Sequence, residues 1–327
     1  MQTIRRPRMI LVCAALAGVI CPTRAWTQTY PAHQVRVIVP AAAGGPSDVI
    51  GRVLAQKLSE RLGQQFYVEN IPTAAGNVGI GMAAKAAPDG YTILTPTSAV
   101  VVNPSLYAKL PYDTLKDFAP VTLVAASPHV MTASLSVPAV SVKELIAVVR
   151  ANPGKYSYAS PGTGTTGQLA GELFKLSLGL DLVHVPFNGG APAILSTIGG
   201  HTPIAFTALP AAASYIKSGQ IRALAVTSAQ RAAEFPDVPT LAEQGFPDQV
   251  SEFVQCLLVP AGTPGDVIDK LYRETAAIVA LPEVKDQLRA LGYSPVANTP
   301  AEFAIQIKAE VAKWGRVIHD AGIKQIE

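Results

Sequence analysis

Residues 35–62 read VRVIVPAAAGGPSDVIGRVLAQKLSERL, and the expected architecture follows from this segment. Its β-branched start, Val35–Val39, leads into a loop of small residues, 41–47. From Val49 onward, apolar residues recur at the i, i+3, i+4 spacing of an amphipathic helix. The segment therefore predicts a strand, a glycine loop and a helix. The first amides of such a helix lack internal partners and carry the positive end of the helix dipole, so they favour an anion.

A second copy of this pattern lies about 120 residues further along the chain. Residues 156–159 form a short strand pattern, the loop SPGTGTTG occupies 160–167, and residues 168–178 have helical periodicity. Neither loop contains Lys or Arg. We expect the two helix starts to face each other across a cleft and to hold one small anion. Taken singly, each loop also fits an ordinary turn from strand to helix, with Asp48 as a helix cap.

The N-terminal residues have the layout of a cleavable secretory signal. Three arginines precede an apolar run at residues 9–20, and small residues stand at Thr23 and Ala25. The run is too short to span a membrane comfortably. We therefore expect residues 1–25 to be a signal peptide that is cut after Ala25, and the mature protein to be free in the periplasm.

Removal of this leader changes the charge balance and the cysteine content. The whole chain has a formal net charge of +3, but residues 1–25 hold four arginines and no acid, so the mature chain has −1. The sequence therefore gives no argument for nucleic-acid or membrane binding. Two of the three cysteines are also removed. The third, Cys256, lies among apolar residues, so we expect a buried thiol and no internal disulfide.

The order of the predicted elements gives two similar α/β halves joined by two crossings. Strands and helices alternate over residues 35–95 and again over 156–227, which is typical of parallel sheets. The extended stretch 121–134 and the proline-containing stretch 235–245 are the expected crossings. We predict two α/β domains with parallel or mixed sheets, joined by a two-strand hinge, as in a hinged, clam-shaped binding protein. The predicted domains are residues 26–125 with 236–327, and residues 126–235, with the ligand cleft between them.

The second loop also fits the dinucleotide fingerprint G-x-G-x-x-G at residues 162–167. The next strand, however, ends at residues 186–188 without an acid for the ribose, and Gln168 stands where a P-loop has Lys. The sequence has no G-x-S-x-G, H-E-x-x-H or paired-cysteine motif, so we expect no catalytic residues and no metal site. We expect His184, inside an apolar strand, to be a structural hydrogen-bonding residue. An exported α/β enzyme, or a nucleotide-binding protein that uses this loop, stays open as the alternative.

Many ordered motifs, from about Tyr30 to the C-terminus, resemble the Bug-type solute receptors of tripartite tricarboxylate transporters. They are VIVPAAAGGPSDVIGRVLAQKLSERLGQ, VENIPTAAGNVG, AAPDGYTIL, SYASPGTGTTGQLAGELFK, LVHVPFNGGAPAI, IRALAVTSAQR, VPTLAEQG and LLVPAGTP. The resemblance implies a bacterial periplasmic receptor with two Rossmann-like domains, similar to a type II periplasmic binding protein, that close on a small carboxylate. It further implies delivery to a membrane permease made of one large and one small subunit. We expect no enzyme activity, no cofactor and a monomer. A signalling role, or an orphan receptor without a permease, stays open.

The resemblance also implies where the carboxylate is held. In the family, two loops grip it through backbone amides, hydroxyls and ordered water, without an arginine clamp. Glycines in both loops are expected to turn the chain tightly, with positive φ. Strand ends nearby add hydroxyl and amide groups at the edge where open α/β sheets bind ligands. The predicted ligand-binding residues are Ala43, Gly44, Gly45, Pro46, Ser47, Asp48, Thr97, Ser98, Ser160, Gly162, Thr163, Gly164, Thr165, Thr166, Phe187, Asn188 and Thr207.

Two departures from the family pattern bear on the ligand. Many members have Arg in the stretch matching residues 70–72, where this chain has Ile71. Many also have Asp where this chain has Thr207. An acid there pairs with a ligand ammonium group, and Thr does not. The sequence therefore favours an unsubstituted or hydroxylated mono- or dicarboxylate over an amino acid.

Overall fold

The structure is a computed structural model that describes residues 30–73 and 76–327. The predicted signal peptide, residues 1–25, lies outside the described residues. The strands are β1 (Val35–Val39), β2 (Phe66–Asn70), β3 (Thr92–Leu94), β4 (Phe118–Ala133), β5 (Ser157–Ser160), β6 (Val183–Pro186), β7 (Ile204–Ala208), β8 (Arg222–Val226), β9 (Glu252–Pro260) and β10 (Ser294–Pro295). The helices are α1 (Pro46–Leu62), α2 (Asn77–Ala84), α3 (Ala99–Leu106), α4 (Val142–Arg150), α5 (Thr166–Leu178), α6 (Gly190–Ile198), α7 (Leu209–Lys217), the 3₁₀ turn η1 (Pro247–Gln249), α8 (Gly265–Ala280), α9 (Pro282–Ala290) and α10 (Pro300–Asp320).

These strands form one mixed sheet in the order β2-β1-β3-β9-β4-β7-β5-β6, with β8 and β10 also paired to β4. β1 is parallel to β2 and β3, and β5 is parallel to β6 and β7. Between these two sets run β4 and β9, which are antiparallel to each other. The prediction of a mixed α/β fold with two halves is confirmed. The two parallel sets, however, belong to one continuous sheet.

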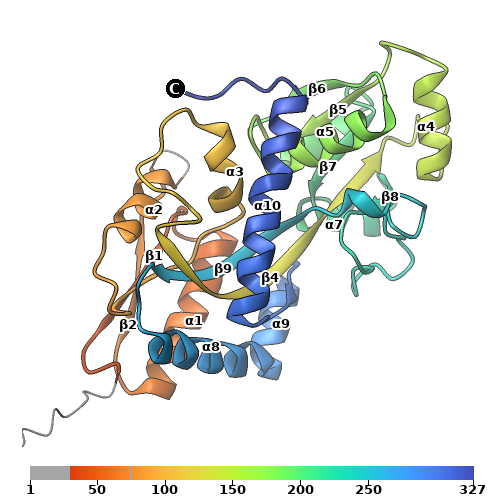
Figure 1. Cartoon of the computed structure of the whole chain (residues 1–327). Coiled ribbons are helices and arrows are strands. Elements are labelled where there is room, and N and C mark those ends of the chain that lie inside the picture. Colours follow the sequence, from red (N-terminus) through yellow and green to blue (C-terminus); the bar gives the residue numbers. More distant parts are fainter. Residues whose placement is uncertain (1–29, 74–75) are drawn as a thin grey trace, which may run out of the picture.

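The long strand β4 joins the two halves. Residues 118–128 of β4 pair with β9, and residues 129–133 pair with β7. We call β1–β3 with α1–α3, α8 and α9 the β1 half, and β5–β8 with α4–α7 the β5 half. Figure 1 shows β4 passing from one half to the other, with α10 lying across both.

Apolar side chains fill both faces of the sheet in each half. In the β1 half, α1, α8 and α9 cover one face around Ile50 and Leu271, while α2, α3 and α10 cover the other around Trp314. This second cluster includes Leu169 of α5, so it continues into the β5 half. There, α4 and α5 pack around Phe174 on one face, and α6 and α7 pack on the other. The helices α8 and α9 thus pack on the β1 half, and the cluster under α10 extends into both halves.

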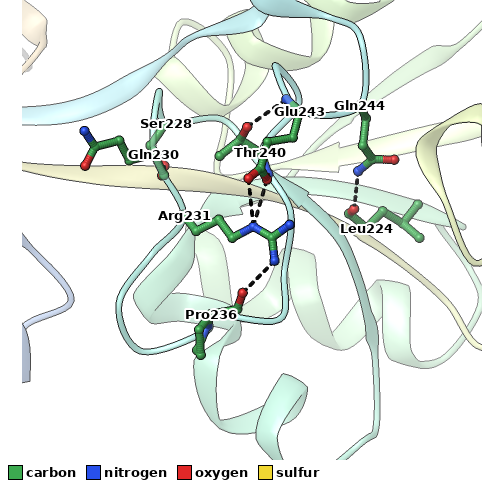
Figure 2. Close-up of polar contacts among 8 residues, drawn as sticks. All are labelled: Leu224, Ser228, Gln230, Arg231, Pro236, Thr240, Glu243 and Gln244. Atoms are coloured by element: carbon green, nitrogen blue, oxygen red, sulfur yellow. Dashed lines mark hydrogen bonds and ion pairs between the residues drawn. The ribbon is translucent and has the colours of Figure 1, made fainter.

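The segment between β8 and β9 packs against the β5 half. Arg231 Nε donates to both carboxylate oxygens of Glu243, at 3.0 and 2.8 Å, and its Nη1 donates to the Pro236 carbonyl at 2.8 Å (Figure 2). Gln244 Nε2 donates to the Leu224 carbonyl of β8 at 2.9 Å. These contacts fold the segment back on β8 before the chain enters β9 at Glu252.

The helix α3 is absent from the predicted elements. Its first turn is rich in valine and it contains Pro104, two features that hide a helical pattern in the sequence. Cys256 is 1% exposed, which confirms the predicted buried thiol, and burial raises its pKa. Within the described ranges, no helix combines the length and the apolar character that a membrane crossing needs.

Candidate functional site

The carboxyl ends of β3 and β7 point toward each other along β4. Thr97, just beyond β3, is bridged to Gln255 of β9, which pairs with Ala125 of β4. Ala208, the last residue of β7, pairs with His129 of β4. Ala125 and His129 are separated by roughly 13 Å along the strand, at about 3.3 Å per residue. Because β1 ends beside β3 and β5 ends beside β7, the loops that start α1 and α5 lie at two facing edges.

The first loop, residues 41–48, is held by the side chain of Asp48. Its Oδ2 accepts from the Gly44 amide at 2.8 Å and from Arg52 Nε at 3.0 Å. Its Oδ1 accepts from Asn70 Nδ2 at 2.9 Å, and the same Asn70 nitrogen donates to the Ala41 carbonyl at 3.1 Å. Both carboxylate oxygens are therefore engaged inside the protein. Asp48 positions the loop, and Arg52 balances its charge.

The pKa of Asp48 shows which interaction dominates. Burial opposes ionisation of this carboxyl group, but the hydrogen bonds from Arg52, the Gly44 amide and Asn70 outweigh burial and hold the pKa below its ordinary value. The carboxylate is thus charged at neutral pH. Around it, Ala43, Gly44 and Pro46 are exposed, Gly45 is half-buried and Ser47 is buried.

The second loop, residues 160–166, has the same shape but a neutral support. Gln168 Oε1 accepts from the Gly164 amide at 2.6 Å. Thr165 Oγ1 donates to the Gly162 carbonyl at 2.7 Å and accepts from the Gln168 amide at 3.3 Å, which caps α5. Gly162 and Gly164 have φ values of 144° and 77°, and Gly44 in the first loop has 82°. Gly45 is different from the expectation: as the N-cap of α1 it has φ −78°, which any residue adopts.

Both helices begin with amides that have no acceptor in the described part of the chain. In α1 these belong to Ser47 and Asp48, because Pro46 has no N–H and the next amide bonds to the Gly45 carbonyl. In α5 they belong to Thr166 and Gly167, since Thr165 caps the amide that follows. Together with the helix dipoles, these donors favour an anion at both edges. The positive charge of Arg52 beside the first loop is paired with Asp48.

The remaining predicted residues join one edge or the other. Thr97 is half-buried at the end of β3, whereas the Ser98 hydroxyl is buried and bonds to β9, accepting from the Val254 amide at 2.9 Å. Phe187 and Asn188 lie beside the second loop, where the Phe187 amide donates to the Ser160 carbonyl at 3.0 Å. The Thr207 hydroxyl, at the end of β7, is buried and has no hydrogen-bond partner among the described residues.

Two histidine side chains from neighbouring strands, His184 and His129, contact hydroxyl groups of the second loop. The Ser160 hydroxyl is buried and lies 2.7 Å from His184 Nε2 on the neighbouring strand β6. Burial lowers the pKa of His184, so the ring is neutral at pH 7. Thr166 Oγ1 lies 3.0 Å from Nε2 of His129 on β4. Exposed Thr163, at the tip of the loop, completes the set of predicted residues on this edge.

The two halves also contact each other through two glycines. A β-carbon at Gly164 would lie 2.3 Å from Leu106 Cδ2 at the end of α3, so this glycine is packed against the β1 half. A β-carbon at Gly292, which follows α9, would lie 2.2 Å from Cγ of Pro210 at the start of α7. The first of these contacts involves a loop that is predicted to bind ligand.

The two loops thus lie at opposed sheet edges that are joined by crossing strands. The profile of the tripartite tricarboxylate transporter family receptor matches residues 50–323. The chain belongs to this receptor family. It is 35% identical to Protein BugT of Bordetella pertussis over 326 residues, with 99% of each chain covered. The predicted resemblance to Bug-type receptors is confirmed.

Solved structures similar to the receptor include two with carboxylates. One is an R. palustris protein with adipate, which has 33% identity, a TM-score of 0.74, and covers 91% of this chain and 100% of its own. Another is MatC from Rhodopseudomonas palustris with bound malate, which has 28% identity, a TM-score of 0.69, and covers 88% of this chain and 100% of its own.

Several residues that shape the receptor's site were not among those predicted. Asn70, Arg52 and Gln168 hold the loops, and Leu106 contacts one of them from the other half. Gln168 alone carried a local signal, because it stands at the third position of its helix, as Asp48 does in the other. The support from Gln168 also argues against a phosphate cradle, since it occupies the Gly164 amide. No group of three metal-binding side chains occurs in residues 30–73 and 76–327.

Proposed function

We propose that the receptor binds a small organic carboxylate between the two loops. The observation that carries this proposal is the pair of opposed helix starts, each with unsatisfied amides and neither with a net charge. A carboxylate bridging the two edges accepts hydrogen bonds from both. The carboxylates in the two related structures from R. palustris support this class of ligand.

The site residues of the proposal are the two loops with Thr97, Phe187, Asn188 and Thr207. Asp48, Ser98 and Ser160 shape the site through the backbone that their side chains hold. The division into domains at residues 125 and 235 stays a prediction. So does the signal peptide with cleavage after Ala25, which is proposed to place the mature receptor in the periplasm.

The receptor is proposed to act as a monomer and to deliver its ligand to the membrane permease of a tripartite tricarboxylate transporter. Its fold supports binding and release, because two crossing strands join halves that face each other. We propose no catalysis, since a receptor that returns its ligand unchanged needs only a reversible closure.

The test is calorimetric titration of the mature protein with succinate, malate and aspartate. These dicarboxylates differ only in carrying hydrogen, hydroxyl or ammonium at C2. Succinate or malate is expected to bind more tightly than aspartate, because Thr207 supplies no charge for an ammonium group. Any ligand at a hundred times its Kd should add about 2.7 kcal/mol to the free energy of unfolding.

Two results contradict the proposal. Tight binding of aspartate would refute the argument from Thr207, while leaving the carboxylate site intact. Absence of binding across these three acids, adipate and a wider carboxylate library would refute the carboxylate site itself. Conversion of a bound acid to a product, followed by NMR, would refute the proposal that the receptor is not an enzyme.

A further inference from the structure

The imidazole of His129 lies where the two crossings meet the second loop. His129 is the first residue of β4 that pairs with the β5 half, opposite Ala208, and only 2% of it is exposed. Its Nε2 lies 3.0 Å from Thr166 Oγ1, and its Nδ1 lies 3.4 Å from the Ser251 carbonyl. Ser251 immediately precedes β9, the return strand. One ring therefore touches the outgoing crossing, the return crossing and the first residue of α5.

The backbone around this ring is fixed by Thr227, just beyond β8. The His129 amide donates to Thr227 Oγ1 at 2.9 Å, and the Thr227 amide donates to the His129 carbonyl at 2.9 Å. Thr227 Oγ1 also bonds to the Ser251 carbonyl at 2.5 Å, while the Ser251 amide donates to the Thr227 carbonyl at 3.0 Å. The ring is thus attached to a rigid support, and its orientation is set by the strands.

The protons in this cluster follow from its acceptors. Nδ1 of His129 lies 3.4 Å from the Ser251 carbonyl, which only accepts, and 3.5 Å from the Ser251 hydroxyl, which can also donate. We assign a proton to Nδ1 from the shorter contact, the one with the carbonyl. Burial lowers the pKa of His129 to about 4, against the opposing effect of the bond to Ser251, and Lys313 lowers it further. The ring is neutral at pH 7, so Nε2 carries a lone pair. The Thr166 hydroxyl therefore donates its proton to Nε2 and has none to offer a carboxylate.

We propose that His129 is a positioning residue that ties the second loop to both crossing strands through Thr166. Among the residues that the structure describes, the first loop has no equivalent tie, because Asp48, Arg52 and Asn70 all belong to the β1 half. Thr166 then contributes to ligand binding through its backbone amide. Its side chain couples the position of the second loop to that of the crossing strands. The link to affinity rests on the proposed function, whereas the tie itself is a property of the unliganded chain.

The tie is tested on the mature protein without ligand, by amide hydrogen exchange and histidine NMR. Thr166→Val and His129→Leu should each raise exchange about tenfold at the bonded amides of Gly164, Thr165 and Gln168, the effect of one lost hydrogen bond on local opening. His129→Gln can place its amide oxygen, an acceptor, near the Nε2 position and should restore protection. His129→Asn, whose shorter amide lies near the Nδ1 position, should not. The bonded amides of Gly44 and Val49 are the internal control and should exchange as in the parent.

Thr132→Val is the matched control for Thr166→Val. Thr132 lies on β4 and is fully buried, and its hydroxyl has no partner among the described residues, so its loss should leave the second loop unchanged. In the parent, the ring should show the Nδ1–H tautomer from pH 6 to 8. An Nε2–H tautomer, or unchanged exchange at the three bonded amides of the second loop in Thr166→Val, would overturn the proposal. Since neither measurement uses a ligand, a wrong carboxylate assignment would not affect them.

A titration with malate then separates the tie from the proposed function. If malate binds the parent, Thr166→Val should weaken it about tenfold and Thr132→Val should not. If malate fails to bind the parent while exchange behaves as expected, the tie holds and the ligand assignment fails. Equal malate affinity in the parent and Thr166→Val, with faster exchange, would confine the role of His129 to loop order and refute its effect on binding.

Discussion

The two loops have nearly the same backbone and different supports. In each, the third residue of the helix accepts the amide of a glycine four residues earlier, at 2.8 Å for Asp48 and 2.6 Å for Gln168. Gly44 and Gly164 have φ values of 82° and 77°. The support is an ion pair within one half in the first case, and a neutral amide in the second.

The difference lies in what each loop touches. The first loop is held by Arg52 and Asn70 of its own half, so it keeps its shape whatever the other half does. The second loop is packed against Leu106 of the β1 half and bonded through Thr166 to the crossing strand. The first loop is therefore independent of the other half, whereas the position of the second loop depends on how the two halves are placed.

The largest expected effect is a difference in ligand affinity when one methyl group is added to the matching glycine of each loop. Gly164→Ala and Gly44→Ala share the cost of a positive φ, about 1–2 kcal/mol. Only at Gly164 would the new β-carbon overlap Leu106, because nothing lies within 4 Å of a β-carbon at Gly44. Gly164→Ala should weaken ligand binding on the order of 1000-fold, and Gly44→Ala about tenfold. Calorimetry on both variants measures this, and Leu106→Ala should partly restore binding to Gly164→Ala. Equal losses would show that the loops are not coupled differently.

The next effect concerns the tie of the second loop and its response to pH. The pKa of His129 is about 4 in the folded chain, against 6.5 in the unfolded chain. The unfolded chain thus binds the proton first, so stability is complete above pH 6.5 and falls as the pH drops toward 4. The loss is about 3 kcal/mol. Denaturant unfolding of the parent and His129→Gln between pH 4 and 7 should show a flatter profile in the variant. Parallel profiles would contradict the neutral buried ring.

A smaller effect belongs to the ion pair of the first loop. The pKa of Asp48 is lowered in the folded chain, so its contribution is present above the unfolded pKa and is lost as the pH falls through the folded value. Asp48→Asn should cost about 1–3 kcal/mol at pH 7 and less below pH 3. The matched change Gln168→Glu introduces a buried charge and should also lower the free energy of unfolding. Its pH dependence should be the opposite of that of the parent's Asp48. Chemical unfolding at pH 3 and pH 7 checks both, and a constant cost for Asp48→Asn would argue against a charged pair.

The smallest effect is expected at Gly45. Its φ of −78° suits any residue, and a β-carbon there would meet only the Ala42 carbonyl, at 3.5 Å. Gly45→Ala should change the free energy of unfolding by less than about 0.5 kcal/mol, because a stiffer unfolded chain offsets a poorer N-cap. Any loss of affinity in this variant then measures occlusion of the ligand. Thermal unfolding and calorimetric titration on one preparation separate the effect on stability from the effect on ligand affinity.

Local patterns predicted the elements that carry the site. The two strand–loop–helix units, the hydroxyls after β3 and the mixed α/β fold are all readable from residue spacing within short windows. The helix α3 was hidden by its valines and Pro104, and with it the contact between Leu106 and Gly164. The loop glycines were predicted as a class, yet Gly45 has an ordinary φ because it serves as a helix cap.

Long-range pairing explains what the sequence could not give. His129 meets Thr166 and Ser251, which are 37 and 122 residues away, and no local pattern encodes those contacts. The continuity of the sheet through β4 and β9 also depends on pairing rather than on composition. Asp48 was predicted as either a cap or a ligand-binding residue, and only the position of Asn70 shows how its two oxygens are used.

The placement of Trp314 on α10 gives the receptor an intrinsic optical reporter. Its indole is 1% exposed and belongs to the apolar cluster that also contains Leu106 and Leu169, one from each half. The ammonium group of Lys313 lies 4.4 Å from the centre of the indole ring, close enough to perturb its emission. Any rotation of one half against the other changes the surroundings of this chromophore. Stopped-flow fluorescence should therefore follow the proposed closure in real time, with no dye attached.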